Sequence, residues 1–562
     1  MKKQWKRLAA LSSAAVMAAG TLLYFPTDTL QNISWEITAS AEETGAETVT
    51  ESQTWTESDG LIWTLDADGT MTISGKGAMK NYVYDSPVYN NKNIKKVVIE
   101  EGVTSIGKYA FQDCSSLASI EIPKSITSIG GSAFWRCTSL ISITIPESVT
   151  SIGESAFFKC SSLTDITIPG SVTSIENNAF QSCTGLKSIE IPESVTSIEF
   201  YTFKNCTGLT SIAIPESVTN IGEGAFSWCS SLTGISIPKS VTSIGDDAFR
   251  YCNNLASITI PKGVASIGDR AFSGCDNLTE VLLEGGSTLT SDDLGVDASI
   301  IRTYWNEDNL TWTLDAEGTL TISGEGAMKA YSWNAGSPAL QKKDNVKKVV
   351  IEDGVTSIGE YAFWGCSSMT SITIPDSVTS IGNNAFGNCT GLTDIKIPER
   401  VTIIGNDAFY NCTGLTDVEI PESVTSIGDS VFYNCTGLSS INIPKGVTSI
   451  GNSAFDSCSS LTSISIPKSV TSIGDSAFQN CRNLASIEIL SSVTSIGNRV
   501  FYNCTGLTDV EIPDSVTSIG DSAFGNCSRL TDVTIPSSVT SIGGSAFSGT
   551  AWLKSKQQKN PL

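Results

Sequence analysis

The sequence predicts a β-rich solenoid in which 23-residue coils stack into two tandem arrays. Three observations predict it: the even spacing of the cysteines, an apolar phrase that returns with the same period, and a second, longer repeat. Self-similarity at a period of about 20–50 residues is the signature of a repeat architecture. The cysteines fall into two sets with steps of 23 residues, namely Cys114, Cys137, Cys160, Cys183, Cys206, Cys229, Cys252 and Cys275, then Cys366, Cys389, Cys412, Cys435, Cys458, Cys481, Cys504 and Cys527.

One unit reads L-x-x-I-x-I-P-x-x-V-T-S-I-G-x-x-A-F-x-x-C. The apolar–polar alternation of Leu461–Pro467 predicts a short strand, which Pro467 ends because proline cannot donate a ladder hydrogen bond. A unit offers about eight inward groups worth roughly 1.5–3 kcal/mol each. The backbone entropy cost of about 1–2 kcal/mol per residue exceeds that gain for one unit alone. A unit therefore becomes stable only when it stacks against neighbouring coils, which contribute the missing free energy.

Sixteen cysteines suggest disulfides as one possibility and a ladder of free thiols as the other. Stacked strands lie about 4.8 Å apart, and the Cβ atoms of equivalent residues share that spacing. A disulfide requires a Cβ–Cβ distance of roughly 3.5–4.5 Å, so pairing would pull the coils out of register. We therefore expect buried free thiols that pack as small hydrophobes. The chain has no C-x-x-C pair and no histidine, so we expect no metal site.

The longer repeat brings Gly60–Tyr82 back as Asn309–Tyr331. Alternation on both sides of Asp68-Gly69 predicts a β-hairpin. A calcium loop using Asp66, Asp68 and Asp315 is the alternative, but an EF-hand needs more ligands. We expect each copy to cap an array. The predicted organisation is a β-hairpin cap at 59–96, a first array at 97–283, a linker at 284–304, a second β-hairpin cap at 305–348, a second array at 349–553 and a tail at 554–562.

The N-terminus combines a basic start, an apolar run from Leu8 to Phe25 and the small residues Ala39-Ser40-Ala41. This pattern predicts a secretory signal peptide at 1–41. An uncleaved anchor is the alternative, because about 18 apolar residues could just span a bilayer. The polar stretch 42–58 is expected to be a flexible leader. We thus expect a secreted or bacterial cell-surface protein with no membrane span after cleavage.

The units resemble the BspA-like (Treponema-type) leucine-rich repeats of bacterial surface proteins, as in the phrase from Leu140 to Cys160. The resemblance covers residues 97–283 and 349–553. It implies a right-handed leucine-rich-repeat solenoid with a parallel sheet, export, and attachment to host or neighbouring surfaces. The repeat of this family contains no catalytic residues that could be carried over.

Composition excludes several classes of function. With 35 basic and 58 acidic residues the net charge is −23, which argues against nucleic acid as a partner. The absence of histidine excludes Ser-His and Cys-His catalysis. Carboxylate pairs one coil apart could form a solvated acidic face, bridge a divalent cation, or catalyse glycoside hydrolysis; these are Glu488 with Glu511, Asp394 with Asp417, and Asp509 with Asp532. We expect no enzyme and no cofactor.

The positions just after the inward phenylalanine of each unit are left free by the repeat, yet many carry large rings. Such residues either cover the edge of the core or form a binding stripe, since aromatic residues and arginine dominate binding hot spots. The candidate ligand-binding residues are Trp135, Phe158, Arg250, Trp364, Tyr410, Tyr433 and Tyr502 at these positions, with Trp228 and Tyr251 one position further along.

These patterns predict an exported, non-enzymatic binding or adhesion protein whose partner is an extracellular protein or glycan. A carbohydrate-binding accessory of a secreted polysaccharide-degrading system is the alternative. A purely structural spacer, or a chain that continues beyond Leu562, also stays open.

Overall fold

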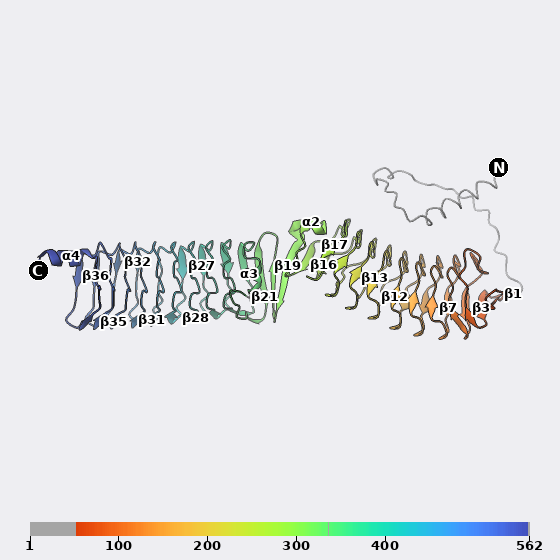
Figure 1. Ribbon diagram of the computed structural model, residues 1–562, viewed down its shortest axis with the longest axis horizontal. Coiled ribbons are helices and arrows are strands. Elements are labelled where there is room, and N and C mark those ends of the chain that lie inside the picture. The colour runs from red at the N-terminus through yellow and green to blue at the C-terminus, as the bar shows by residue number, and fades with distance from the viewer. Residues whose placement is uncertain (1–51, 335, 560–562) are drawn as a thin grey trace, which may run out of the picture. The chain divides into compact units, whose positions relative to one another are not determined.

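The computed structural model describes residues 52–334 and 336–559 (Figure 1). The predicted signal peptide and residues 42–51 of the predicted leader lie outside these residues. Within the described part of the chain, no helix combines the length and apolar character needed to cross a bilayer.

Most coils contribute two short strands to two parallel ladders, and successive coils pair with a register shift of 23 residues; the other coils join the first ladder through isolated bridges, at Glu190, Ala213, Ser236 and Asn442. Asp394 lies opposite Asp417 in one ladder, and Ser426 lies opposite Ser449 in the other. The strand predicted within Leu461–Pro467 is present as β32 (Ser463–Ile464). The predicted fold, a parallel-sheet leucine-rich-repeat solenoid, is confirmed.

The strands of the first array fall into two ladders. The first ladder contains β5 (Lys96–Ile99), β7 (Ser119–Glu121), β9 (Ser142–Thr144), β11 (Asp165–Thr167), β16 (Ser257–Ile260) and β18 (Glu280–Glu284). The second contains β6 (Val103–Ser105), β8 (Ser128–Ile129), β10 (Ser151–Ile152), β12 (Ser174–Ile175), β13 (Ser197–Ile198), β14 (Asn220–Ile221), β15 (Ser243–Ile244) and β17 (Ser266–Ile267).

The second array repeats this arrangement. Its first ladder contains β23 (Lys348–Ile351), β25 (Ser371–Thr373), β27 (Asp394–Lys396), β29 (Asp417–Glu419), β32, β34 (Ser486–Ile487), β36 (Asp509–Glu511) and β38 (Asp532–Thr534). Its second contains β24 (Val355–Ile358), β26 (Ser380–Ile381), β28 (Ile403–Ile404), β30 (Ser426–Ile427), β31 (Ser449–Ile450), β33 (Ser472–Ile473), β35 (Ser495–Ile496), β37 (Ser518–Ile519) and β39 (Ser541–Ile542).

A short antiparallel meander forms the cap that precedes each array. In the first cap β1 (Gln53–Thr56), β2 (Ile62–Leu65) and β3 (Thr70–Ser74) pair in order, and β3 continues in parallel onto β5. The second cap uses β19 (Ile301–Glu307), β20 (Leu310–Leu314) and β21 (Thr319–Gly324) in the same way before β23. Shorter strands, β4 (Gly77–Ala78) and β22 (Gly326–Ala327), join the second ladder of each array.

The hairpin turn of each cap explains its aspartates. The Asp66 carboxylate accepts hydrogen bonds from the backbone N–H groups of Asp68 and Thr70, at 3.0 and 2.8 Å. Asp315 accepts from the N–H of Thr319 at 2.7 Å. These carboxylates therefore stabilise the turn, as expected for Asp in turns.

The segment expected as a linker is folded. Residues 284–304 include α2 (Ser291–Leu294), η2 (Ala298–Ile300) and the first half of β19, which pairs in parallel with β18. A seven-stranded sheet therefore runs without interruption from the first array into the second, through the strands coloured green in Figure 1.

Two expected segments differ in the structure. Four residues of the expected flexible leader form β1, because Trp55 pairs with Trp63 and packs against the core of the first cap. At the other end α4 (Ala551–Lys559) replaces most of the expected tail, and Trp552 packs on Phe547 to cover the last coil. The remaining helix, α3 (Pro338–Gln341), belongs to the second cap.

The core of each coil is a set of eight apolar side chains. In one representative coil all eight are at most 7% exposed: Leu438, Ile441, Ile443, Val447, Ile450, Ala454, Phe455 and Cys458. The phenylalanines of successive coils stack along each array at ring-centroid distances such as 5.3 Å between Phe386 and Phe409. Trp63 and Trp312 end the two stacks.

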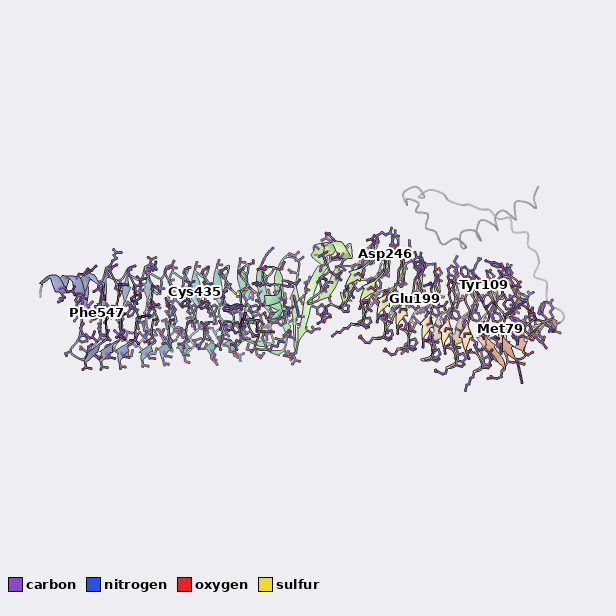
Figure 2. All side chains as sticks on the ribbon, viewed as in Figure 1. Met79, Tyr109, Glu199, Asp246, Cys435 and Phe547 are labelled. Atoms are coloured by element: carbon purple, nitrogen blue, oxygen red, sulfur yellow. The ribbon has the colours of Figure 1, made fainter. Side chains whose placement is uncertain are left out.

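Each cysteine fills a buried slot, and the structure shows sixteen free thiols. The Cys435 thiol donates a hydrogen bond to the Phe409 carbonyl of the preceding coil, with a sulfur–oxygen distance of 3.2 Å. The same contact recurs along both arrays, and Figure 2 labels Cys435 among the side chains of the second array. The slot thus needs a small side chain that can donate a hydrogen bond. The spacing of the cysteines alone did not reveal this requirement.

Docking of the second cap onto its array gives the first prediction. A Cβ atom added at Gly359 would lie 2.0 Å from the Lys329 carbonyl oxygen of this cap, a contact that real Cβ atoms do not make. We expect Gly359→Ala to lower the free energy of unfolding by about 1–3 kcal/mol, as overpacking does. Gly234→Ala is the matched control, since its Cβ would meet nothing within 4 Å. Equal urea-denaturation midpoints for the two variants would contradict close docking.

Candidate functional site

The candidate site lies at a corner of the coil that two left-handed residues create. In one coil these are Ser453 and Ser457, with φ of 52° and 64°. Their N–H groups donate to carbonyls of the next coil, at 2.9 Å to Asp475 and 2.8 Å to Gln479. The residues after the inward phenylalanine therefore lie at this corner in every coil.

We call the predicted residues on this corner the corner stripe: Trp135, Phe158, Trp228, Arg250, Tyr251, Trp364, Tyr410, Tyr433 and Tyr502. All are partly buried except Trp228, which is 46% exposed. The structure brings eight of them together in three groups, whereas Tyr502 lies apart from the others. In the first group, Trp135 stacks on Phe158 at 3.9 Å with an interplanar angle of 17°.

The second group combines Trp228, Arg250 and Tyr251. The Trp228 and Tyr251 rings lie 4.1 Å apart, and the Arg250 guanidinium lies 4.8 Å from the Tyr251 ring centroid. Both Trp228 and Tyr251 are left-handed, with φ of 65° and 59°. A bulky residue in this region is a conformational outlier that costs about 1 kcal/mol or more. Burial does not offset that cost for Trp228, because nearly half of the side chain is exposed.

The third group spans several coils of the second array. Tyr410 and Tyr433 stack at 5.0 Å with an interplanar angle of 3°. The Trp364 ring lies over Gly387, where an added Cβ would be 2.1 Å from the ring, and so reaches Tyr410 at 6.3 Å. Tyr502 instead lies beside Gly525 and accepts a hydrogen bond from the Asn526 amide at 3.0 Å.

Sequence reasoning missed Tyr201 as part of this surface. The Lys204 ammonium lies 3.9 Å from its ring centroid, and its hydroxyl donates to Glu223 at 3.2 Å. Burial, reinforced by Glu223, raises the pKa of Tyr201 to about 12, and burial lowers the pKa of Lys204. The signal was the phrase Phe200-Tyr201, which places two rings where most units carry small or polar residues.

Sequence reasoning also missed an asparagine ladder beside the rings of the second array. Asn411 donates to Asn388 at 2.7 Å, and Asn434 donates to Asn411 at 2.6 Å. Asparagine tolerates the left-handed conformation that this position requires. The repeated dipeptide Asn-Cys would have revealed the ladder. The corner of the second array thus alternates aromatic rings with amides.

The carboxylate pairs lie elsewhere, on the exposed face of the first ladder. Asp509 and Asp532 are directly opposite each other, as are Asp394 and Asp417. Glu488 forms a bridge with Glu511. All six residues are exposed, and within the described residues no group of three or more potential metal ligands occurs. This arrangement matches a solvated acidic face.

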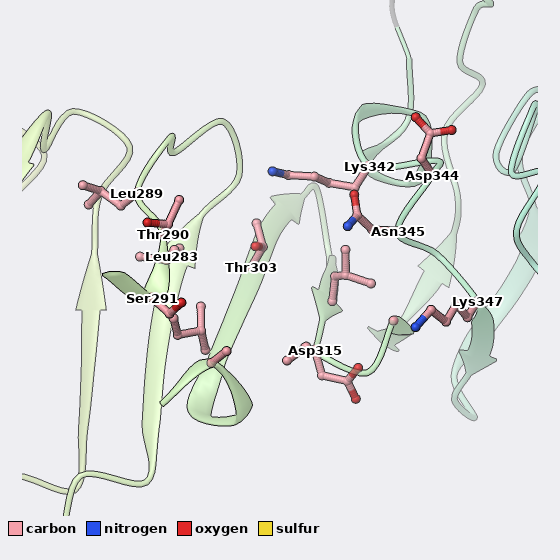
Figure 3. Close-up of a pocket in the computed structure, with 15 residues that line it drawn as sticks. Leu283, Leu289, Thr290, Ser291, Thr303, Asp315, Lys342, Asp344, Asn345 and Lys347 are labelled. Carbon is pink, nitrogen blue, oxygen red and sulfur yellow. The ribbon is translucent and has the colours of Figure 1, made fainter. Parts of the chain in front are cut away.

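A separate pocket of about 310 Å³ lies where the first array meets the second cap (Figure 3). Its lining combines apolar residues such as Leu283 with Thr303, Asp315, Lys342 and Lys347. Two carboxylates, Asp315 and Asp344, line this pocket, and Asp315 accepts the turn hydrogen bond from the N–H of Thr319.

Comparison with known proteins identifies the repeat. The family profile described as "BspA type Leucine rich repeat region (6 copies)" matches residues 83–209, 173–293, 335–462 and 448–560, which together cover more than half of the chain. No functionally curated protein matches the chain.

Solved structures of bacterial proteins are also similar. A leucine-rich repeat protein from Bacteroides ovatus is 26% identical, with 83% of this chain and 94% of that chain covered and a TM-score of 0.32. A leucine rich cell surface protein from Faecalibacterium prausnitzii is 29% identical, with 82% and 94% covered and a TM-score of 0.28. The family profile is decisive: this chain belongs to the BspA-type leucine-rich repeat family.

Proposed function

We propose that this chain is an exported, non-enzymatic binding protein that presents its corner stripe to an extracellular macromolecule at a bacterial cell surface. The observation that carries the proposal is Trp228, a left-handed tryptophan that is 46% exposed and stacks on Tyr251. The left-handed position recurs in every coil, so what distinguishes Trp228 is a large exposed ring where most coils carry a small or polar residue.

The scaffold suits this role. Stacked coils hold the stripe at fixed intervals, and a repeat solenoid offers a long binding surface of this kind. Partly exposed Trp, Tyr and Arg are the residues that dominate binding energy when a partner covers them. Export is supported by the predicted signal peptide at 1–41. A surface location is supported by the similar F. prausnitzii protein, which is described as a cell surface protein.

A binding role fits the chemistry of the chain better than catalysis. The chain lacks histidine, and the opposed carboxylates of the first ladder are exposed to solvent. The acid of a glycosidase is a carboxyl group in a buried environment that raises its pKa, and the carboxylates of this ladder are not buried. Turnover of a polysaccharide that disappears on Asp509→Asn would contradict the non-enzymatic proposal.

A carbohydrate-binding accessory is the second candidate, and the asparagine ladder favours it. Asn411 and Asn434 place amides directly beside the stacked Tyr410 and Tyr433 rings. Amides can hydrogen-bond sugar hydroxyls while aromatic rings contact the apolar faces of the sugar. The second array could therefore serve a glycan as well as a protein.

The test is a binding screen of the full chain against immobilised matrix proteins, mucin and plant polysaccharides. A variant with Trp228, Tyr251, Tyr410 and Tyr433 changed to Ser runs beside it. Retention on protein or mucin that the variant loses supports the first candidate, and loss of polysaccharide retention supports the second. Retention of a ligand by both forms alike would place the site away from the corner stripe.

A further inference from the structure

Each cap carries one large, strongly exposed aromatic side chain at an equivalent position. Tyr84 is 58% exposed and Trp333, 249 residues later, is 69% exposed. Each follows, two residues on, a tyrosine that covers the end of the core: Tyr82 is fully buried and Tyr331 is 8% exposed. Tyr82 and Tyr331 therefore cover the ends of the two cores, and the exposed rings are not needed to cover them.

The Tyr84 ring is held in place although it is exposed. It stacks on Tyr109 at 5.9 Å with an interplanar angle of 22°, and Tyr89 meets it edge-on at 5.5 Å. Its backbone is left-handed, with φ of 58°, and the N–H of Val83 donates to Asp85 at 2.6 Å. The loop thus fixes a ring with one face against Tyr109 and more than half of its surface in solvent.

The second cap keeps the left-handed tyrosine of the first coil. Tyr361 occupies the position of Tyr109 in the first coil of its array, and both are left-handed, with φ of 53° and 58°. Most other coils carry Ser, Asn or Asp there. Trp364 meets Tyr361 edge-on at 5.4 Å. Both copies of the duplication therefore combine an exposed ring with a left-handed tyrosine that the core does not require.

The surroundings of the exposed rings favour a sugar over a protein surface. The described residues of the Tyr84 loop (83–91) and of the Trp333 loop (332–334 and 336–337) are mainly Tyr, Trp, Ser, Asn and Gly, which supply rigid rings and adaptable hydrogen bonds. A stable protein interface buries about 800 Å² on each partner, whereas one exposed ring with two supporting rings offers far less. The apolar C–H face of a pyranose matches a single ring face, whose negative quadrupole attracts C–H groups.

We propose that the Tyr84 loop and the Trp333 loop form two equivalent binding sites for a neutral glycan. In each site the exposed ring stacks on one sugar, and neighbouring polar groups such as Asp85 and Asn334 hydrogen-bond its hydroxyls. Two such sites on one chain engage two units of the same polymer, which raises avidity without any new contact. The exposed rings of the two sites, Tyr84 and Trp333, are not members of the corner stripe.

Isothermal titration calorimetry of the full chain with cellohexaose, mannohexaose and xylohexaose tests the proposal. We expect at least one hexasaccharide to bind at two sites per chain. Tyr84→Ser and Trp333→Ser should each halve the stoichiometry, and the double variant should not bind. Retention of the single variants on the matching immobilised polysaccharide should fall by roughly 10²-fold, because avidity is lost.

Two control variants distinguish binding at these loops from binding elsewhere on the chain. Ile403→Ser removes an equally exposed apolar side chain, 62% exposed, away from both loops, and should bind like the wild type. Ile141→Ser removes another exposed apolar side chain, 54% exposed, and should also leave both loop sites intact. Absence of binding to every hexasaccharide, or unchanged binding by the double variant, would overturn the proposal. A protein ligand lost by the double variant would show that the loops recognise polypeptide instead, and would overturn it too.

Discussion

The second array is expected to unfold steeply as the pH rises above about 9. Burial raises the pKa of Cys366, Cys412 and Cys527 to about 12, from the value of 9.0 for an exposed thiol. Between these values the unfolded chain loses thiol protons that the native chain retains, so stability falls as pH rises. Each thiol contributes about 1.4 kcal/mol per pH unit, or roughly 11 kcal/mol per pH unit for the eight thiols of the array.

Circular dichroism and thiolate absorbance recorded along one alkaline titration measure this effect. The two signals should change together, because a thiol ionises only when its coil opens. As a control, the chain denatured at neutral pH should react with sixteen equivalents of a thiol reagent. Full thiolate absorbance near pH 9 from a chain that is still folded would contradict the buried ladder, as would eight or fewer reactive thiols after denaturation.

The phenylalanine stack should account for the largest single-residue effect. Phe409 is fully buried between Phe386 and Phe432, at ring distances of 5.3 and 5.4 Å. We expect Phe409→Ala to lower the free energy of unfolding of the second array by about 3–5 kcal/mol, because it removes the ring and leaves a cavity. Urea denaturation of the full chain measures the difference.

Tyr410 is the matched control, since it is the next residue and belongs to the corner stripe. Its ring contacts Tyr433 and Trp364 but is only partly buried. Aromatic pairs contribute about 0.5–1.5 kcal/mol, so Tyr410→Ser should cost about 1 kcal/mol. If Tyr410→Ser destabilised the array as much as Phe409→Ala, the stripe would be part of the core, and its role in binding would be wrong.

The regular part of this fold could be predicted from the sequence because each core position recurs. The alternation of Leu461–Pro467 predicted β32, and the turn at Asp68-Gly69 predicted the β2–β3 hairpin. The even spacing of the cysteines predicted equivalent buried slots, and the structure buries all sixteen. Because the units repeat, a strand or buried position that is predicted correctly in one unit is predicted correctly in the others.

The features that break the repeat were not predictable in the same way. The sheet between β18 and β19 depends on pairing across residues 284–304, where the repeat motif is lost. The position of the Trp364 ring depends on Gly387 in the next coil, a relation that no single unit contains. The left-handed corner positions accept many residue types, so their composition did not reveal their conformation.

We infer that folding and binding use different positions of the same coil. Surface plasmon resonance of the full chain on immobilised mucin examines this directly, for the wild type and for the variant with Trp228, Tyr251, Tyr410 and Tyr433 changed to Ser, once circular dichroism shows that both are folded. We predict that the wild type binds and that the folded variant loses at least roughly tenfold in affinity, as the loss of hot-spot residues produces. A folded variant that binds mucin as well as the wild type would contradict this separation of roles.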